Sequence, residues 1–226
     1  MSTAPDASRS GATLAIAFRP PSHSLMEIVI PLALVLLGLH WLNVREQRAR
    51  VLVLASYLGK YRIEKLMENL IQGYLRALGE SDVQRQTSIW GMLEATEVEL
   101  CEQFNAFVLA FAKVDEAQAR VSKLAFALPF ATQWLPAYSF DMRKLLGVHA
   151  HAMTRAASNT EQQAPKGKAF TLMAELLLMQ HSCHWFCRSR IVASARLLAR
   201  HKTRYAQVLM SVAPATRQAY GALVGC

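Results

Sequence analysis

Charged residues are scarce in this sequence. They form 18% of the 226 residues, against a usual share of about 25%, whereas apolar residues reach 53%. This balance fits a membrane-associated protein or a protein with a large hydrophobic core. The length provides one ordinary domain of ~100–200 residues plus an anchor, which argues against two enzymes in one chain.

Cysteine is scarce as well. The few thiols do not form the dense, regularly spaced set that staples a small secreted domain, so that class is excluded. A reducing compartment is the simpler explanation, and it would place the main domain on the cytoplasmic side of a membrane. The cysteines are Cys101, Cys183, Cys187 and Cys226.

Glycine is too sparse to build a phosphate-binding loop, because only ten glycines are spread along the chain. The G-x-S-x-G elbow of serine hydrolases is missing too. Cysteines inside predicted helices are poorly placed for nucleophilic catalysis. We therefore expect a protein without catalytic activity.

One long apolar run is present, over residues 24–44 (SLMEIVIPLALVLLGLHWLNV). A helix of this length measures ~30 Å, the thickness of the hydrocarbon core of a bilayer. We predict a single transmembrane helix, although the strictly apolar part, residues 28–39, is also short enough for a buried core helix or an interfacial helix. The residues assigned to the span are Ile28, Leu32, Val35, Leu36, Leu39 and Trp41.

The flanks of this run predict its direction. Residues 1–23 form a polar tail that we expect to be flexible, and Ser24 with Glu27 forms a capping box at the helix start. Arginines follow the run at positions 45, 48 and 50, whereas the tail carries only two. The positive-inside rule then places the tail outside and the main domain in the cytoplasm, as in a bacterial-type inner membrane. We expect the run to stay attached, since it lacks a small-x-small cleavage site.

Residues 45–226 show helical spacing almost throughout. We therefore predict an all-α fold, in which the transmembrane helix is followed by a cytoplasmic bundle of four to five helices. One bundle helix ends at Gly79, and the next begins with the capping pattern Ser81–Gln84 and runs to about Val114. Four glutamates of that second helix are expected on a solvated face: Glu94, Glu97, Glu99 and Glu102.

Residues 124–140 are uncharged but contain two prolines, which argue against a second span. Two interpretations remain: a broken segment packed over the bundle core, or a loop whose Phe130, Trp134 and Tyr138 enter the membrane interface. A polar stretch near residues 158–168 is the predicted hinge. The last long helix should cover about Ala169 to Val212.

Polar groups interrupt the apolar first half of that last helix, at Glu175, His181 and His184. A lipid-facing helix would be strongly destabilised by them. We therefore predict a central bundle helix rather than a second membrane span.

The same helix carries the densest set of possible metal ligands. His181 and His184, like His184 and Cys187, lie about 60° apart on a helix, and imidazole and thiolate are ligands that zinc and copper prefer. Buried cysteines and histidines are also ordinary core residues, and no recognised metal-binding spacing is present. We predict no cofactor and keep metal binding as an alternative. The candidate ligands are His181, Cys183, His184 and Cys187, with His149 or His151 from another helix.

The C-terminal region is basic. Residues 166–226 contain nine Lys and Arg against Glu175 alone. On one continuous helix, Arg190, Arg196, Arg200 and Arg204 fall within about 120°, and Ile191, Ala195, Leu198, Tyr205 and Leu209 lie opposite. Such a face is suited to anionic lipid headgroups, to nucleic acid, to an acidic protein, or simply to solvent.

Together these patterns favour a membrane-tethered interaction or assembly protein that holds a partner at the cytoplasmic membrane face. The expected partners are the lipid bilayer and a second protein, ahead of nucleic acid. Two alternatives remain. One is a zinc or copper protein built on residues 181–187, and the other is a nucleic-acid binder that uses the basic C-terminal helix.

Overall fold

The computed structural model of the chain describes residues 23–225, which are mostly helical, as predicted. The predicted tail lies outside the described residues except for His23, and so does the side chain of Ser24 with its capping box. The described elements are α1 (His23–Leu58), α2 (Ile63–Gly79), α3 (Val83–Phe111), α4 (Glu116–Ala119), β1 (Arg120–Ser122), α5 (Ala131–Trp134), the 3-10 helix η1 (Pro136–Tyr138), β2 (Ser139–Asp141), α6 (Met142–Ala157), α7 (Pro165–Cys187), α8 (Arg190–His201), α9 (Tyr205–Ser211) and α10 (Pro214–Val224).

Helix α1 continues past Val44, the predicted end of the apolar helix, to Leu58. The chain divides into two compact units, residues 1–40 and residues 41–226, and α1 contributes to both. Among the described helices, α1 alone is long and apolar enough to cross a membrane, over Met26–Leu58, with a mean hydropathy of 1.8 in its most apolar window. None of the residues in that window is buried.

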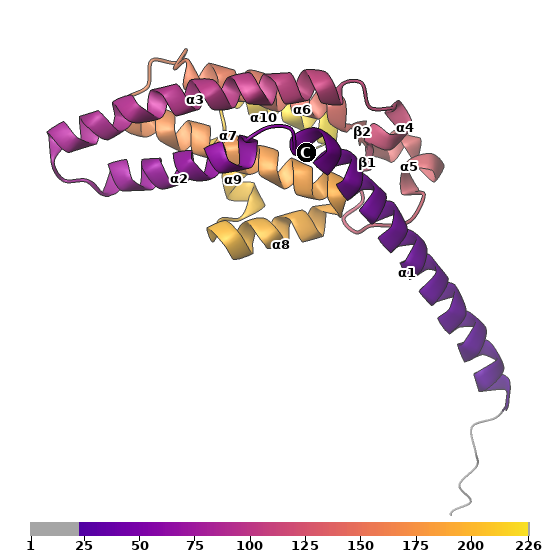
Figure 1. Ribbon diagram of the computed structural model, residues 1–226. Coiled ribbons are helices and arrows are strands. Elements are labelled where there is room, and N and C mark those ends of the chain that lie inside the picture. The colour runs from indigo at the N-terminus through magenta and orange to yellow at the C-terminus, as the bar shows by residue number, and fades with distance from the viewer. Residues whose placement is uncertain (1–22, 226) are drawn as a thin grey trace, which may run out of the picture. The chain divides into compact units, whose positions relative to one another are not determined.

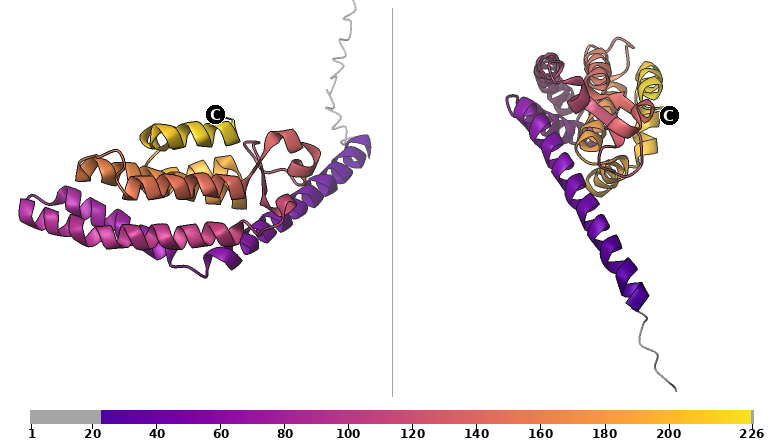
Figure 2. Two further views of the ribbon diagram at one scale, coloured as in Figure 1. Left: turned by 90° about the horizontal axis from the view of Figure 1, so that it is seen from above. Right: turned by 90° about the vertical axis from the view of Figure 1, so that its right-hand side faces the viewer.

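Four helices of the larger unit, α2, α3, α6 and α7, pack side by side around the hydrophobic core (Figure 1). Their buried residues recur at three- and four-residue spacing, as in Ile63, Leu66 and Leu70 of α2. Helix α7 is the central one, because it packs against α2, α6, α8 and α9. Helix α10 lies on α6 (Figure 2, left). The predicted helical bundle is therefore confirmed, and so is the predicted central position of the apolar helix that is now α7.

Two helix boundaries differ from the prediction. Helix α3 is capped by Asp82 rather than Ser81, because the Asp82 carboxylate accepts from the backbone N–H groups of Gln84 and Arg85. The predicted helix over residues 169–212 is three helices. The first break follows Cys187, where Ser189 caps α8, and the second is at Lys202, which has a left-handed φ of 53°.

Strands β1 and β2 pair antiparallel, with Arg120 opposite Asp141 and Ser122 opposite Ser139. The pairing brings together the two ends of the uncharged segment predicted to be broken. That segment is indeed irregular, containing only the short α5 and η1. We call residues 124–138 the aromatic loop.

Candidate functional site

The residues assigned to the span are all exposed, with between 42% and 65% of their surface accessible. Exposed apolar side chains in such a continuous run are unusual for a helix in water. Trp41, at the end of the run, carries the Arg45 guanidinium over its ring at 5.6 Å. An aromatic ring beside an arginine is typical of a membrane–water interface.

The part of α1 just after the run holds the aromatic loop in place. The Asn43 side-chain amide donates to the carbonyl of Ala127 at 3.4 Å, and the Glu46 carboxylate accepts from the backbone N–H of Phe130 at 3.0 Å. Nearby, the Arg188 guanidinium donates to the Gln47 side-chain oxygen at 2.6 Å. Residues 43–50 therefore connect the aromatic loop to the junction of α7 and α8.

The aromatic loop turns most of its large side chains outward. Ala131 is buried beneath it, but Trp134 is 71% exposed and Tyr138 is 62% exposed. The expectation that residues 124–140 pack over the core therefore holds for Ala131 and for Phe140, which is 4% exposed and contacts the Trp185 ring, but not for the other large side chains. The exposed large apolar residues of the loop are Phe126, Leu128, Phe130, Trp134, Leu135 and Tyr138.

The predicted basic face is divided between elements. Arg196 and Arg200 are exposed on α8, whereas Arg204 precedes α9 and half-buried Arg190 lies over the Trp185 ring at 5.7 Å. The predicted apolar side of this face is also wrong for Ile191 and Leu198, which are exposed. The break at Lys202 and the packing of Ala193 and Leu197 against the bundle explain both differences. The exposed surface of α8 thus mixes Ile191, Val192 and Leu198 with Arg196 and Arg200, and we call it the α8 face.

Three of the predicted metal ligands have another neighbour. The Nε2 atom of His181 lies 3.1 Å from the Ser194 hydroxyl, and its ring stacks on Tyr205. The Nδ1 atom of His184 lies 3.3 Å from an Arg196 nitrogen, and the Cys183 thiol lies 3.7 Å from the Met179 sulfur. Among residues 23–225, no group of three His, Cys, Asp or Glu residues is arranged to hold a metal ion.

Protonation states work against ligation by the cysteines but not by His181. Burial lowers the pKa of His181 to about 4, which keeps its imidazole in the neutral form that binds metal, whereas burial raises the pKa of the Cys187 thiol to about 11. Burial likewise raises the pKa of Cys183. Because the thiolate is the form that binds metal, these cysteines behave as buried apolar residues. His149, expected as a ligand from another helix, instead lies 2.9 Å from the Ser182 hydroxyl.

A buried ion pair crosses the bundle at Glu97, a residue that we expected on a solvated face. Glu97 is 4% exposed, accepts a 2.6 Å hydrogen bond from the Tyr74 hydroxyl and pairs with the Lys168 ammonium. Burial and the Glu97 charge raise the pKa of Tyr74. The sequence held a signal for this position, because Glu97 continues the buried row of Leu93 and Leu100 at helical spacing.

A second buried carboxyl group, Glu175 on α7, caps a neighbouring helix. Its Oε1 atom accepts from the Ala213 backbone N–H at 3.1 Å and from the Thr216 hydroxyl at 2.8 Å, at the start of α10. Its Oε2 atom has no hydrogen-bond partner among the described residues. Burial raises the pKa of Glu175 to about 7, against the opposing effect of the Thr216 and Ala213 hydrogen bonds.

Neither of two small pockets in the bundle resembles a substrate site. One is lined by residues of α1, the aromatic loop and the α7–α8 junction, and the other lies near Arg155 and Thr216. Each has a cavity volume of about 20 Å³, room for about one water molecule.

Comparison with known proteins adds no relative: no protein-family model, no curated protein and no solved structure matches this chain.

Proposed function

We propose that this chain is a membrane-anchored helical protein that holds an acidic partner protein at the cytoplasmic membrane face, without catalytic activity of its own. The observation that carries the proposal is the run of exposed apolar side chains in α1. Transfer of such a run from water to hydrocarbon is favourable, and its helical backbone satisfies its own hydrogen bonds. The helical bundle would then work beside the membrane.

The cytoplasmic side is favoured by charge. Arginines at positions 45, 48 and 50 follow the apolar run, whereas the preceding tail carries Arg9 and Arg19 alone. Three described cysteines, Cys101, Cys183 and Cys187, are free thiols, in keeping with a reducing compartment.

The α8 face is the surface that we assign to the partner. Its exposed Ile191 and Leu198 offer apolar contact, and Arg196 and Arg200 select a negatively charged surface. Arginine is suited to this role because its guanidinium binds carboxylates in a bidentate manner. An acidic protein provides carboxylates and apolar contacts together.

The anchor is tested by fractionating cells and washing the membranes with alkaline carbonate. We expect the full chain to stay in the membrane. The double variant Val35→Arg and Leu36→Arg should release it, because an arginine at the centre of a span costs about 2.5–3.5 kcal/mol. The control Leu75→Arg changes a similarly exposed leucine of α2 and should remain in the membrane. Release of the unmodified chain by carbonate would refute the anchor.

The partner surface is tested in cells by a photo-crosslinking amino acid at Leu198 or, as a control, at Leu75. We expect a discrete protein adduct from position 198 only. The double variant Arg196→Glu and Arg200→Glu should abolish it, while Arg76→Glu on α2 should not. An adduct that survives the charge reversal, or that disappears with nuclease treatment, would contradict the assignment of an acidic protein.

A further inference from the structure

The aromatic loop is an exposed apolar surface without any charge. Six large apolar side chains reach solvent between residues 126 and 138, including two aromatic residues with a polar edge, Trp134 and Tyr138. Phe130 and Trp134 also contact each other, with ring centroids 6.1 Å apart. Clustered apolar groups of this kind mark interaction surfaces rather than ordinary solvated loops.

The position of this loop is fixed at the end of the apolar run. Asn43 and Glu46, which bond the backbone of Ala127 and Phe130, belong to the larger unit together with the loop. If the run ends in the membrane at about residue 42, the helical rise of 1.5 Å per residue puts Glu46 only ~6 Å beyond it. The loop backbone therefore lies near the headgroup layer, whatever direction residues 23–40 take.

We propose that the aromatic loop inserts into the interfacial layer of the leaflet in which the α1 span ends, so that the bundle contacts lipid at a second place. This inference rests on the proposed membrane span. Tryptophan and tyrosine are the residues enriched at this depth, because their rings are apolar and their N–H and O–H groups stay hydrated. Exposed Arg45 and Arg48 lie on either side of Glu46 in α1 and are suited to binding anionic headgroups.

The loop is held in shape before any lipid is present. The β1–β2 pairing closes its two ends, and the Lys123 backbone N–H donates to the Tyr138 carbonyl at 2.8 Å. The Trp185 indole N–H donates to the Ser122 carbonyl at 3.0 Å, and the Ile191 N–H donates to the Ala125 carbonyl at 3.1 Å. A preformed loop loses little conformational entropy on insertion, which favours binding.

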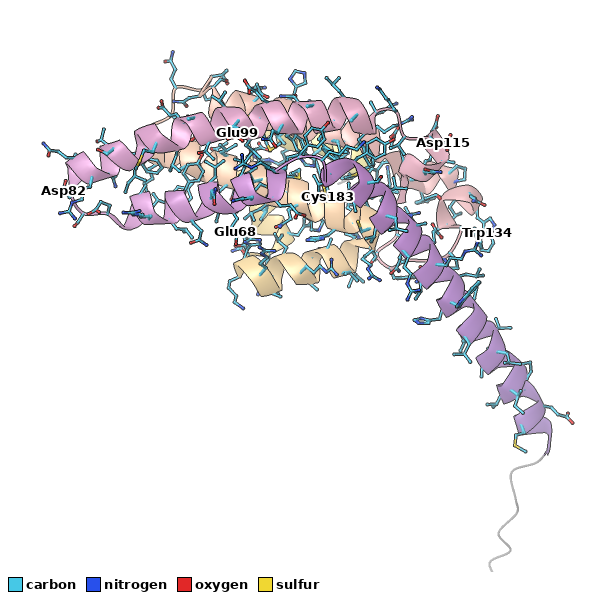
Figure 3. The ribbon with its side chains drawn as sticks, viewed as in Figure 1. Glu68, Asp82, Glu99, Asp115, Trp134 and Cys183 are labelled. Carbon is cyan, nitrogen blue, oxygen red and sulfur yellow. The ribbon has the colours of Figure 1, made fainter. Side chains whose placement is uncertain are left out.

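The test uses the full chain in vesicles of phosphatidylcholine and phosphatidylglycerol, with lipids brominated near the headgroup end of the acyl chains. The fluorescence of Trp134 is obtained by subtracting that of a Trp134→Phe variant. Trp134→Phe combined with Val83→Trp moves the reporter to a position of similar exposure beside Asp82, because Val83 is 74% exposed and Trp134 is 71% exposed. Figure 3 shows Asp82 and Trp134 at opposite ends of the larger unit.

We expect brominated lipid to lower the Trp134 emission by about twofold or more and aqueous iodide to quench it weakly. The Val83→Trp reporter should show the reverse. Equal iodide quenching of the two reporters would overturn the inference. Shielding of Trp134 from both quenchers would also overturn it, because a protein would then cover the loop.

Carbonate extraction of the same vesicles separates this inference from the proposed anchor. If the chain is retained while Trp134 remains open to iodide, the loop inference alone fails. If the chain is released, the span fails and the loop inference fails with it. Retention with quenching by brominated lipid supports both.

Discussion

The apolar run of α1 and the helix α7 are the two most apolar helical stretches of the chain, yet their surroundings are opposite. Side chains from Ile28 to Leu39 are exposed, whereas Leu172, Leu176 and Leu178 of α7 are completely buried. Apolar content alone therefore does not separate a proposed span from a core helix.

The polar residues separate them. Beyond Glu27 near its start, the apolar run of α1 has no charged side chain until Arg45. Helix α7 carries Lys168, Glu175 and His181, and each has a partner on another element. A bundle can supply such partners and a lipid environment cannot, which is why polar groups inside an apolar helix indicate a protein core.

The largest effect should come from breaking the buried ion pair of α7. Lys168→Met leaves the Glu97 carboxylate buried without its cation, and we expect the free energy of unfolding to fall by about 3–5 kcal/mol. Urea unfolding of the full chain in detergent, monitored by circular dichroism, measures this change in free energy. Arg62→Met is the control, because it removes the exposed Arg62–Glu99 pair, which should contribute about 0–1 kcal/mol. Equal losses of unfolding free energy in the two variants would mean that the buried pair stabilises the fold no more than the exposed pair.

Truncating one leucine in each helix tests the comparison directly. Leu176→Ala removes a completely buried side chain and should lower the free energy of unfolding by about 2–5 kcal/mol. Leu36→Ala removes a side chain that is 58% exposed and should leave the unfolding of the bundle unchanged. A comparable loss in both variants would show that the apolar run packs against protein.

Glu175→Gln should change how stability depends on pH. The pKa of Glu175 is raised from 4.5 to about 7 by burial, so its stabilisation is complete below pH 4.5 and is lost as pH rises through about 7. The variant should match the unmodified chain near pH 4.5 and exceed it by up to about 3 kcal/mol at pH 8. Urea unfolding at each pH gives the difference, and a constant difference would contradict the raised pKa.

The variant and the unmodified chain must be compared at each pH because two histidines change the pH dependence of stability in the direction opposite to Glu175. Burial lowers the pKa of His149 to about 3 and that of His181 to about 4. Their contribution is present above pH 6.5 and is lost as pH falls toward the folded-state values.

The smallest effect concerns a single hydroxyl group. Ser182 donates to the Leu178 carbonyl, so its oxygen accepts from the Nε2–H of His149. Ser182→Ala leaves that N–H buried without an acceptor and should cost about 1–3 kcal/mol. Ser88 makes the same bond to the carbonyl four residues earlier but is exposed, so Ser88→Ala should change stability by less than about 0.5 kcal/mol. Thermal unfolding of both variants in detergent provides the check.

Much of the helical fold was predictable, because local signals determine it. The apolar run identified α1, Gly79 marked the end of α2, and Glu175 with His181 placed α7 in the core. The burial of Glu97 was not predicted, since its partner Lys168 is distant in sequence and only the folded bundle brings the two side chains together. The burial of a carboxylate can be predicted from helical spacing only when the cation that pairs with it is also known.

The basic face differs from its prediction for another reason. It relied on one uninterrupted helix, whereas Arg188 and Lys202 leave helical geometry without a glycine or proline to signal it. The break turns the first residues of α8 toward the aromatic loop, where Ile191 bonds Ala125. Ser189, a common N-cap residue, was the only local hint.

The uncharged aromatic loop has a consequence for proteolysis. Between Lys123 and Arg143 the chain contains neither lysine nor arginine, so trypsin has no cleavage site there in any environment. Chymotrypsin, in contrast, meets Trp134 and Tyr138 at the surface. A tryptic digest therefore gives no information about the loop. Comparing chymotryptic cleavage at the loop in detergent-solubilised and in vesicle-bound protein shows whether lipid covers it.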